Sequence, residues 1–144
     1  MKAITVRQPF AGLIICGEKP VENRSRNLAG TYRGPVVIHA SKTLATVGYN
    51  PNPWTILYDL VGLSTWHDQT GVALGTVDLV GVHHATNCDH PEWVGIRFCN
   101  SWALANNHHL VLANPRPFPE PIPHKGALGL WNFPDELLPE GWAL

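Results

Sequence analysis

The sequence predicts an α+β protein, a small mixed β-barrel flanked by short helices. Three observations support this fold class: several apolar segments rich in β-branched residues, frequent turn signals between them, and few stretches with helical periodicity. Of the 144 residues, 44% are hydrophobic and 15% are charged, a composition typical of a globular domain with a buried core. We therefore expect residues 1–144 to form a single domain.

The first forty residues alternate between strand and helix signals. Residues 2–7 are rich in β-branched side chains and predict a first strand. Pro9 suits the first turn of a helix, apolar residues follow at helical spacing, and Gly17 predicts the end of that helix. Residues 18–26 are then the exit from the helix, and the apolar run 36–40 predicts a strand buried on both faces.

Further strands are predicted in the rest of the chain. Residues 43–71 are an excursion between strands, with a short helix over 54–61. Residues 72–82 and 106–113 have strand character, and residues 126–131 supply a closing strand.

A proline occupies every second position from Pro115 to Pro123. Proline cannot donate a hydrogen bond to a sheet, so this run predicts an extended connector on the surface rather than part of a central sheet. Together with the six tryptophans, the run also keeps open a role as a protein-interaction module.

Charge is unevenly distributed along the chain, whose formal net charge is -1. Residues 1–42 hold seven cations and two acids, a charge of +5, so the remainder carries -6. A basic segment on an acidic body suits a local anion site, for a phosphate or a nucleotide, better than binding along a nucleic-acid backbone. Alternatively, this basic segment forms a solvated face of the protein with no ligand.

Five short motifs follow one another in order. They are Gln8-Pro9-Phe10, the segment from Gly17 through Lys19 and Glu22 to Arg24, Arg33-Gly34 before His39-Ala40-Ser41, Leu74 to Leu79, and Pro123 to Gly126 with Leu130-Trp131. Together they resemble the ASCH domain family of the PUA-like β-barrel superfamily, and most of all the ASCH domains of transcription coactivators. The resemblance spans about residues 4–132. It implies a barrel whose cleft, beside the Gly-x-Lys-x-x-Glu-x-Arg segment, holds RNA, DNA or a modified base.

Candidate binding residues lie in and near this segment. Lysine and arginine are the side chains that hold phosphates, and a carboxylate between them can accept a hydrogen bond from a base or orient an arginine. An aromatic ring can stack on an unpaired base. The predicted nucleic-acid-binding residues are Lys19, Glu22, Arg24, Arg26, Ser41 and Lys42, with Asp78 as a further candidate and Phe10, Trp54 or Trp131 as stacking surfaces. The alternative is that Glu22 and Arg24 merely pair with each other or with Asp78.

A second predicted function is enzymatic. One bacterial branch of the family is similar to amidohydrolases that remove an acyl group from cytidine, with a catalytic Lys, Thr and Glu. Carried over by position, these become Lys19, Glu22 and Asp78, of which only the lysine is unchanged. Lys19 with a lowered pKa would activate water, and Glu22 or Asp78 would move the proton.

No cofactor or metal is predicted. His83, His84, Cys88 and His90 lie close in sequence, but their spacing is not a recognised zinc pattern, and adjacent histidines on a strand point to opposite faces. His108, His109 and His124 are expected at the surface, whereas His39 is expected in the core. Three cysteines, no membrane span and no secretory signal predict reduced thiols and a cytoplasmic location, and the oligomeric state stays open.

Overall fold

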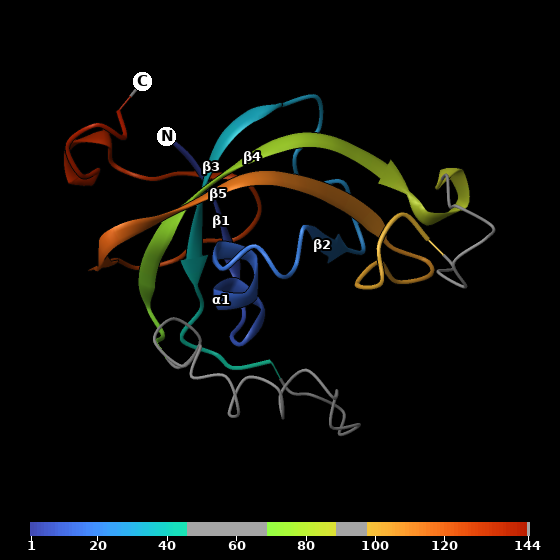
Figure 1. The fold of residues 1–144 in the computed structure, drawn as a ribbon, viewed down its shortest axis with the longest axis horizontal. Coiled ribbons are helices and arrows are strands. Elements are labelled where there is room, and N and C mark those ends of the chain that lie inside the picture. The colour runs from blue at the N-terminus through green and yellow to red at the C-terminus, as the bar shows by residue number, and fades with distance from the viewer. Residues whose placement is uncertain (46–68, 89–97, 144) are drawn as a thin grey trace.

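The computed structural model describes residues 1–45, 69–88 and 98–143. Within these ranges the chain forms a mixed sheet with one short α-helix and two 3-10 helices (Figure 1). In chain order the elements are β1 (Lys2–Val6), α1 (Phe10–Ile15), β2 (Val21–Arg24), β3 (Gly34–Ala40), β4 (Val72–His84), η1 (Ala85–Asn87), β5 (His108–Pro123), β6 (Trp131–Asn132) and η2 (Asp135–Leu137). The prediction of a mostly stranded, mixed β fold with few helices is confirmed.

The sheet has six strands in the order β2-β5-β4-β3-β1-β6. β1 and β3 are parallel, and every other neighbouring pair is antiparallel. β2 and β6 lie at the two edges and are not paired with each other, so among the described residues the sheet does not close into the predicted barrel. With four and two residues, these edge strands offer little backbone with which to close the sheet.

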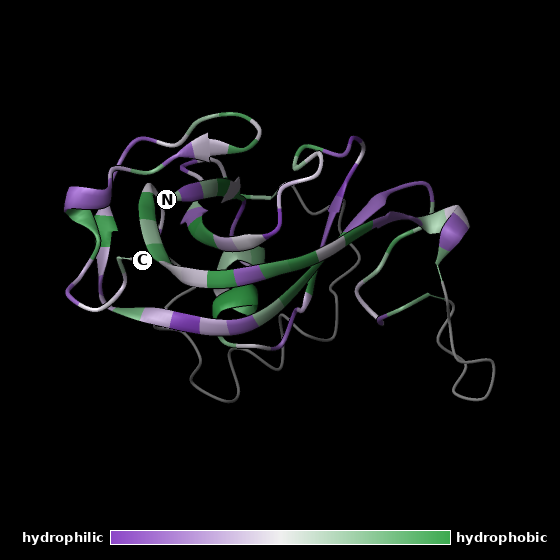
Figure 2. Cartoon of the chain, turned by 90° about the horizontal axis from the view of Figure 1, so that it is seen from above, coloured by the Kyte–Doolittle hydropathy of each residue, from purple (hydrophilic) through white to green (hydrophobic). Residues whose placement is uncertain are grey.

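Apolar side chains fill both faces of the central strands. α1 buries Ala11 to Ile15 against one face, as Figure 2 shows by the hydrophobic helix lying against the sheet. Val36 and Ile38 of β3 point into this cluster, whereas Val37 joins a second cluster with Phe118 and Phe133. Alternate residues of a strand point to opposite faces, so β3 is buried on both sides as its apolar run predicts.

The proline run is a paired part of the sheet rather than the surface connector that the sequence predicted. β5 extends through Pro123, and its proline-rich half pairs with β4, with Gly75 opposite Pro117 and Val72 opposite Pro123. Backbone N–H groups of alternate residues point to the same side of a strand, so prolines at every second position leave the intervening donors for β4. β2 pairs only with residues 108–111, which leaves the other side of the proline half without a neighbouring strand among the described residues.

Other elements differ in extent from the sequence prediction. Val21–Arg24, interpreted as the exit from the helix, forms the strand β2, because β5 supplies a partner for its backbone. The closing strand is limited to Trp131–Asn132, and the helix expected over 54–61 falls outside the described residues. No helix within the described ranges is long and apolar enough to cross a membrane.

Candidate functional site

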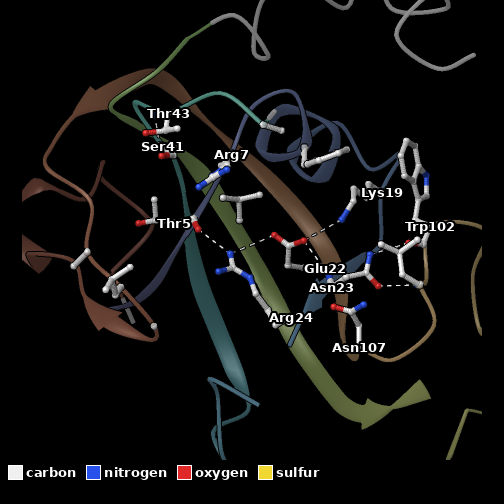
Figure 3. A pocket seen from close by; sticks show the side chains of 17 residues that line it. Thr5, Arg7, Lys19, Glu22, Asn23, Arg24, Ser41, Thr43, Trp102 and Asn107 are labelled. Atoms are coloured by element: carbon white, nitrogen blue, oxygen red, sulfur yellow. Dashed lines mark hydrogen bonds and ion pairs between the residues drawn. The ribbon is translucent and has the colours of Figure 1, made fainter. Parts of the chain in front are cut away.

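A pocket of about 760 Å³ lies where α1, β1 and β2 meet the segment that precedes β5. Its apolar walls come from residues such as Phe10, Trp102 and Leu104. Its polar lining is formed by Thr5, Arg7, Lys19, Glu22, Asn23, Arg24, Ser41, Thr43 and Asn107, which Figure 3 labels. The structure thus gathers four of the predicted site residues, Lys19, Glu22, Arg24 and Ser41, around one cavity.

Glu22 lies at the centre of a small charge network in this pocket (Figure 3). Its Oε1 is 3.2 Å from Lys19 Nζ, and its Oε2 is 3.4 Å from Arg24 Nη2. The backbone N–H of Asn23 also donates to Oε1, at 2.9 Å. Residues 22 and 24 share one face of β2, which explains why a short strand can bring this carboxylate and guanidinium together.

Lys19 is almost completely buried, with 3% of its surface exposed. Burial lowers the pKa of its ammonium group, although the neighbouring Glu22 carboxylate opposes this shift and Arg24 adds to it. Nζ also donates a hydrogen bond to the carbonyl oxygen of Val21, and it lies 5.3 Å from the centre of the Phe10 ring. Lys19 is therefore held by the protein itself rather than presented to a large ligand.

Two arginines are more accessible than Lys19. The Arg24 side chain is 28% exposed, and its Nη2 donates to the carbonyl oxygen of Thr5 at 2.7 Å. Arg7 is exposed, and within the described residues its guanidinium makes no hydrogen bond or ion pair. With three cations and one carboxylate, the lining carries a formal charge of +2 when all four groups are ionised.

The segment before β5 supplies an aromatic and amide wall. The Asn23 side chain fixes this segment, because its Nδ2 donates to the carbonyl of Trp102 at 2.8 Å and its Oδ1 accepts from the N–H of Leu104 at 2.9 Å. The Trp102 indole donates to the carbonyl of Glu18, and its ring meets Phe10 edge-on with centroids 6.4 Å apart. Trp102 is thus held in place as a wall of the pocket.

Several predicted residues lie elsewhere. Asp78 of β4 accepts a hydrogen bond from Asn114 at 2.9 Å and does not line this pocket, which corrects its expected place beside the basic segment. Lys42 lines a second cavity, of about 850 Å³, and Arg26 lines neither. Trp131 is also outside the first pocket, and Trp54 lies outside the described residues.

Arg7, Asn23 and Trp102 line the pocket but were not predicted as site residues. The sequence contains a signal for Arg7 and Asn23, because Arg7 directly precedes the Gln-Pro-Phe motif and Asn23 lies inside the Lys-x-x-Glu-x-Arg segment. Trp102 carried no such signal. It reaches the pocket through the Asn23 contacts, which join segments distant in sequence.

Comparison with known proteins identifies the family. A family model described as the ASCH domain matches residues 4–121, and the chain therefore belongs to the ASCH domain family. A solved structure described as the crystal structure of ASCH from Zymomonas mobilis matches with a TM-score of 0.50 and 14% sequence identity. This match covers 94% of the present chain and 88% of the other chain, and at this identity it shows a shared fold.

Proposed function

We propose that the protein binds nucleic acid, RNA or DNA, and that the pocket holds a nucleotide-sized part of the nucleic-acid strand. The observation that carries this proposal is that Arg7 and Arg24 face the same cavity as the fixed Trp102 ring. Guanidinium groups suit phosphate oxygens, an aromatic wall suits an unpaired base, and the amides of Asn23 and Asn107 can contact a base edge. A cavity of about 760 Å³ is within the usual size of small-ligand sites.

The geometry of the pocket suggests different roles for its three cationic side chains. Arg7 and Arg24 contact phosphate in this proposal, because Lys19 is buried and already donates to Glu22 and Val21. The buried Glu22 carboxylate positions Lys19 and Arg24 through its ion pairs with both side chains. Ser41 contributes a hydroxyl from the end of β3, whereas Lys42 and Arg26 act only as outlying charges for a longer strand.

A fluorescence-anisotropy titration tests the proposal directly. Labelled single- and double-stranded DNA and RNA of one sequence are titrated with the wild type, Arg7→Ala and the exposed control Arg33→Ala, which lines neither cavity. We expect saturable binding to one nucleic-acid form, weakened about tenfold by Arg7→Ala and little changed by Arg33→Ala. Equal affinities for the wild type and Arg7→Ala would contradict the assignment.

The salt dependence provides a second check on the size of the interface. Two accessible arginines neutralise about two phosphates, so log K should fall against log salt with a slope of about -1.4 for a single strand. A slope that corresponds to eight or more phosphates would contradict binding in a small pocket.

The buried lysine favours one second candidate function, hydrolysis of an acylated cytidine-type nucleoside. A lowered Lys19 pKa increases the fraction of neutral amine that can accept a proton from water, and Glu22 at 3.2 Å can take that proton on. Asp78 has no part in this reaction, because it lies outside the pocket. Incubation with N4-acylated cytidines should release free acid and cytidine from the wild type and not from Lys19→Gln, with Lys42→Gln as control; no release by the wild type excludes this activity.

Broader expectations from the sequence belong to the same proposal. They are that residues 1–144 form a single domain of the PUA-like superfamily, that the chain is most similar to coactivator ASCH domains, and that it acts in the cytoplasm. If nucleic acids and acylated nucleosides both fail to bind, a protein-interaction module becomes the favoured function.

A further inference from the structure

Two histidines and two cysteines that do not line the pocket converge at the end of the β4–β5 hairpin. They are His83, Cys88, Cys99 and His109, and their ligand atoms all lie within 4.8 Å of one another. Figure 1 shows how this happens: the chain that follows β4 and the segment that leads into β5 lie beside each other at that end of the hairpin. We propose that these four side chains form a zinc-binding site.

Strand register brings the two histidines together. His83 of β4 is directly opposite His109 of β5, so their side chains share one face of the sheet, while the pair His84 and His108 occupies the other face. Nε2 of His83 is 3.2 Å from Nδ1 of His109. The sequence interpretation grouped His83 with His84 and His90, but His84 points to the opposite face and His90 lies outside the described residues.

His109 has the tautomer that a metal ligand requires. Its side chain is fully buried, contrary to the surface position expected from the sequence, and Nε2 lies 2.7 Å from the carbonyl oxygen of Leu104. A carbonyl only accepts, so Nε2 carries the proton and donates it, and the Nδ1 lone pair faces His83 and Cys99. A backbone carbonyl on the second ring nitrogen is the usual support for a histidine ligand of zinc.

Two cysteines complete the group of four ligands. Cys88 precedes residues 89–97 in the sequence and Cys99 follows them. Sγ of Cys99 is 3.7 Å from Nδ1 of His109, and the backbone N–H of Cys99 donates to Sγ of Cys88 at 3.0 Å. This N–H···S bond holds the Cys88 sulfur beside Cys99, so the two sulfur atoms face the same space as the histidine nitrogens.

The distances fit a tetrahedral ion. Usual Zn–N and Zn–S bond lengths separate two ligand nitrogens by about 3.3 Å and a nitrogen from a sulfur by about 3.6 Å in a tetrahedron. The observed values of 3.2 Å and 3.7 Å are close to these edges. No pair of ligand atoms is farther apart than 4.8 Å, so the contraction needed to reach the sulfur–sulfur edge of a zinc tetrahedron is at most about 1 Å.

The ligand chemistry selects the metal. Two thiolates and two neutral imidazoles prefer Zn²⁺ over Mg²⁺ or Ca²⁺, which bind oxygen ligands. Two thiolates also neutralise the charge of the ion, which suits a cluster whose His109 is completely buried. Four protein ligands leave no open coordination position, so the ion has a structural role.

Titration with Co²⁺, a spectroscopic substitute for Zn²⁺, tests the site on the full chain. The protein is reduced, treated with chelator, exchanged into metal-free buffer and titrated. We expect one equivalent of Co²⁺ to produce the visible bands of tetrahedral cobalt and a near-ultraviolet sulfur-to-metal charge-transfer band, both removed by one equivalent of Zn²⁺. A spectrum typical of octahedral cobalt, or no uptake, would overturn the proposal.

Matched variants assign the ligands. Cys99→Ser and Cys88→Ser should each weaken Zn²⁺ binding by more than about tenfold. Cys16→Ser removes a thiol outside the cluster, and His108→Asn removes a ring on the opposite face of the hairpin, so both should bind Zn²⁺ as the wild type does. Unchanged tetrahedral bands in Cys99→Ser would contradict the assignment.

A measurement on the wild type needs no variant to fold. If the ion connects the end of β4 to the start of β5, Zn²⁺ should raise the midpoint of thermal unfolding and excess chelator should lower it. Identical midpoints with Zn²⁺ and with chelator would contradict a structural zinc.

Discussion

The pocket and the histidine–cysteine cluster both include residues of the segment from Phe98 to His109, but their polar side chains have different kinds of partner. In the pocket, the Glu22 carboxylate lies between two cations of the same chain. In the cluster, two ring nitrogens and two sulfur atoms of the kind that bind Zn²⁺ converge within 4.8 Å. The negative charge of the buried Glu22 is thus neutralised by cationic side chains of the same chain, whereas the converging nitrogen and sulfur atoms of the cluster suit a bound cation.

The two regions also differ in how they are assembled. Lys19, Glu22 and Arg24 are close in sequence, and the short strand β2 is enough to orient them. The cluster depends on the register between β4 and β5, which joins His83 to a residue 26 positions away. The pocket network should therefore respond to local charge changes, and the cluster to changes in the hairpin.

The largest effect is expected when the carboxylate at the centre of the pocket is removed. Glu22→Gln leaves Lys19 buried without its ion-pair partner, and breaking a buried pair costs about 3 kcal/mol of unfolding free energy. Urea denaturation measures this loss. The exposed control Glu120→Gln should change stability by less than about 0.5 kcal/mol. Equal stability of Glu22→Gln and the wild type would show that the network is not needed for the fold.

A slightly smaller effect is expected from a methyl group added inside the hairpin. In Gly75→Ala the new Cβ would meet the backbone of Arg116 and lie 2.8 Å from Cα of Pro117, so the two strands must separate, at a cost of about 2 kcal/mol. Gly81→Ala is the matched control on the same strand, because its Cβ would have Val111 at 4.0 Å as its nearest neighbour. Thermal unfolding of the two variants compares them, and equal midpoints would contradict the close approach of β4 and β5 at Gly75.

The smallest effect is expected from the pH dependence of a second buried histidine. His39 is 1% exposed, as its strand predicts, and Nε2 lies 2.7 Å from the carbonyl of His124. Burial lowers the pKa of His39 below its ordinary value of 6.5. The unfolded chain then binds more protons than the folded chain as the pH falls through 6.5, so this group reduces stability toward acid.

A His39→Asn variant isolates this contribution. The difference in unfolding free energy between the wild type and His39→Asn should become smaller as the pH decreases from about 7.5 to about 5, because only the wild type loses this stability. Urea denaturation at both pH values measures it. A difference that is constant with pH would show that His39 does not titrate between the folded and unfolded states in this range.

Local patterns were sufficient to predict the parts of the fold that depend on nearby residues. The β-branched start of the chain, the helix after Pro9 and the apolar run of β3 all form as expected, because each is determined by its own spacing. The same is true of Lys19, Glu22 and Arg24, which lie within one short motif and line one pocket.

Features that depend on pairing between distant segments could not be predicted in this way. β2 is a strand only because β5 lies beside it, and the alternating prolines enter the sheet because their positions coincide with the side that faces away from β4. The sequence predicted a surface position for His109, but the strand register places it opposite His83, where it is buried. In each case the deciding information is which strand lies opposite, and that is a property of the whole fold.

The most direct test of the proposed binding pocket is a titration of ¹⁵N-labelled protein with a short unlabelled oligonucleotide, followed by NMR. The Trp102 indole signal and the amides of Asn23 and Arg24 should shift in a saturable way, because they line the pocket that Arg7 faces. Shifts confined to Lys42, His124 and Lys125, around the second cavity, would contradict the account and move the binding site to the other pocket.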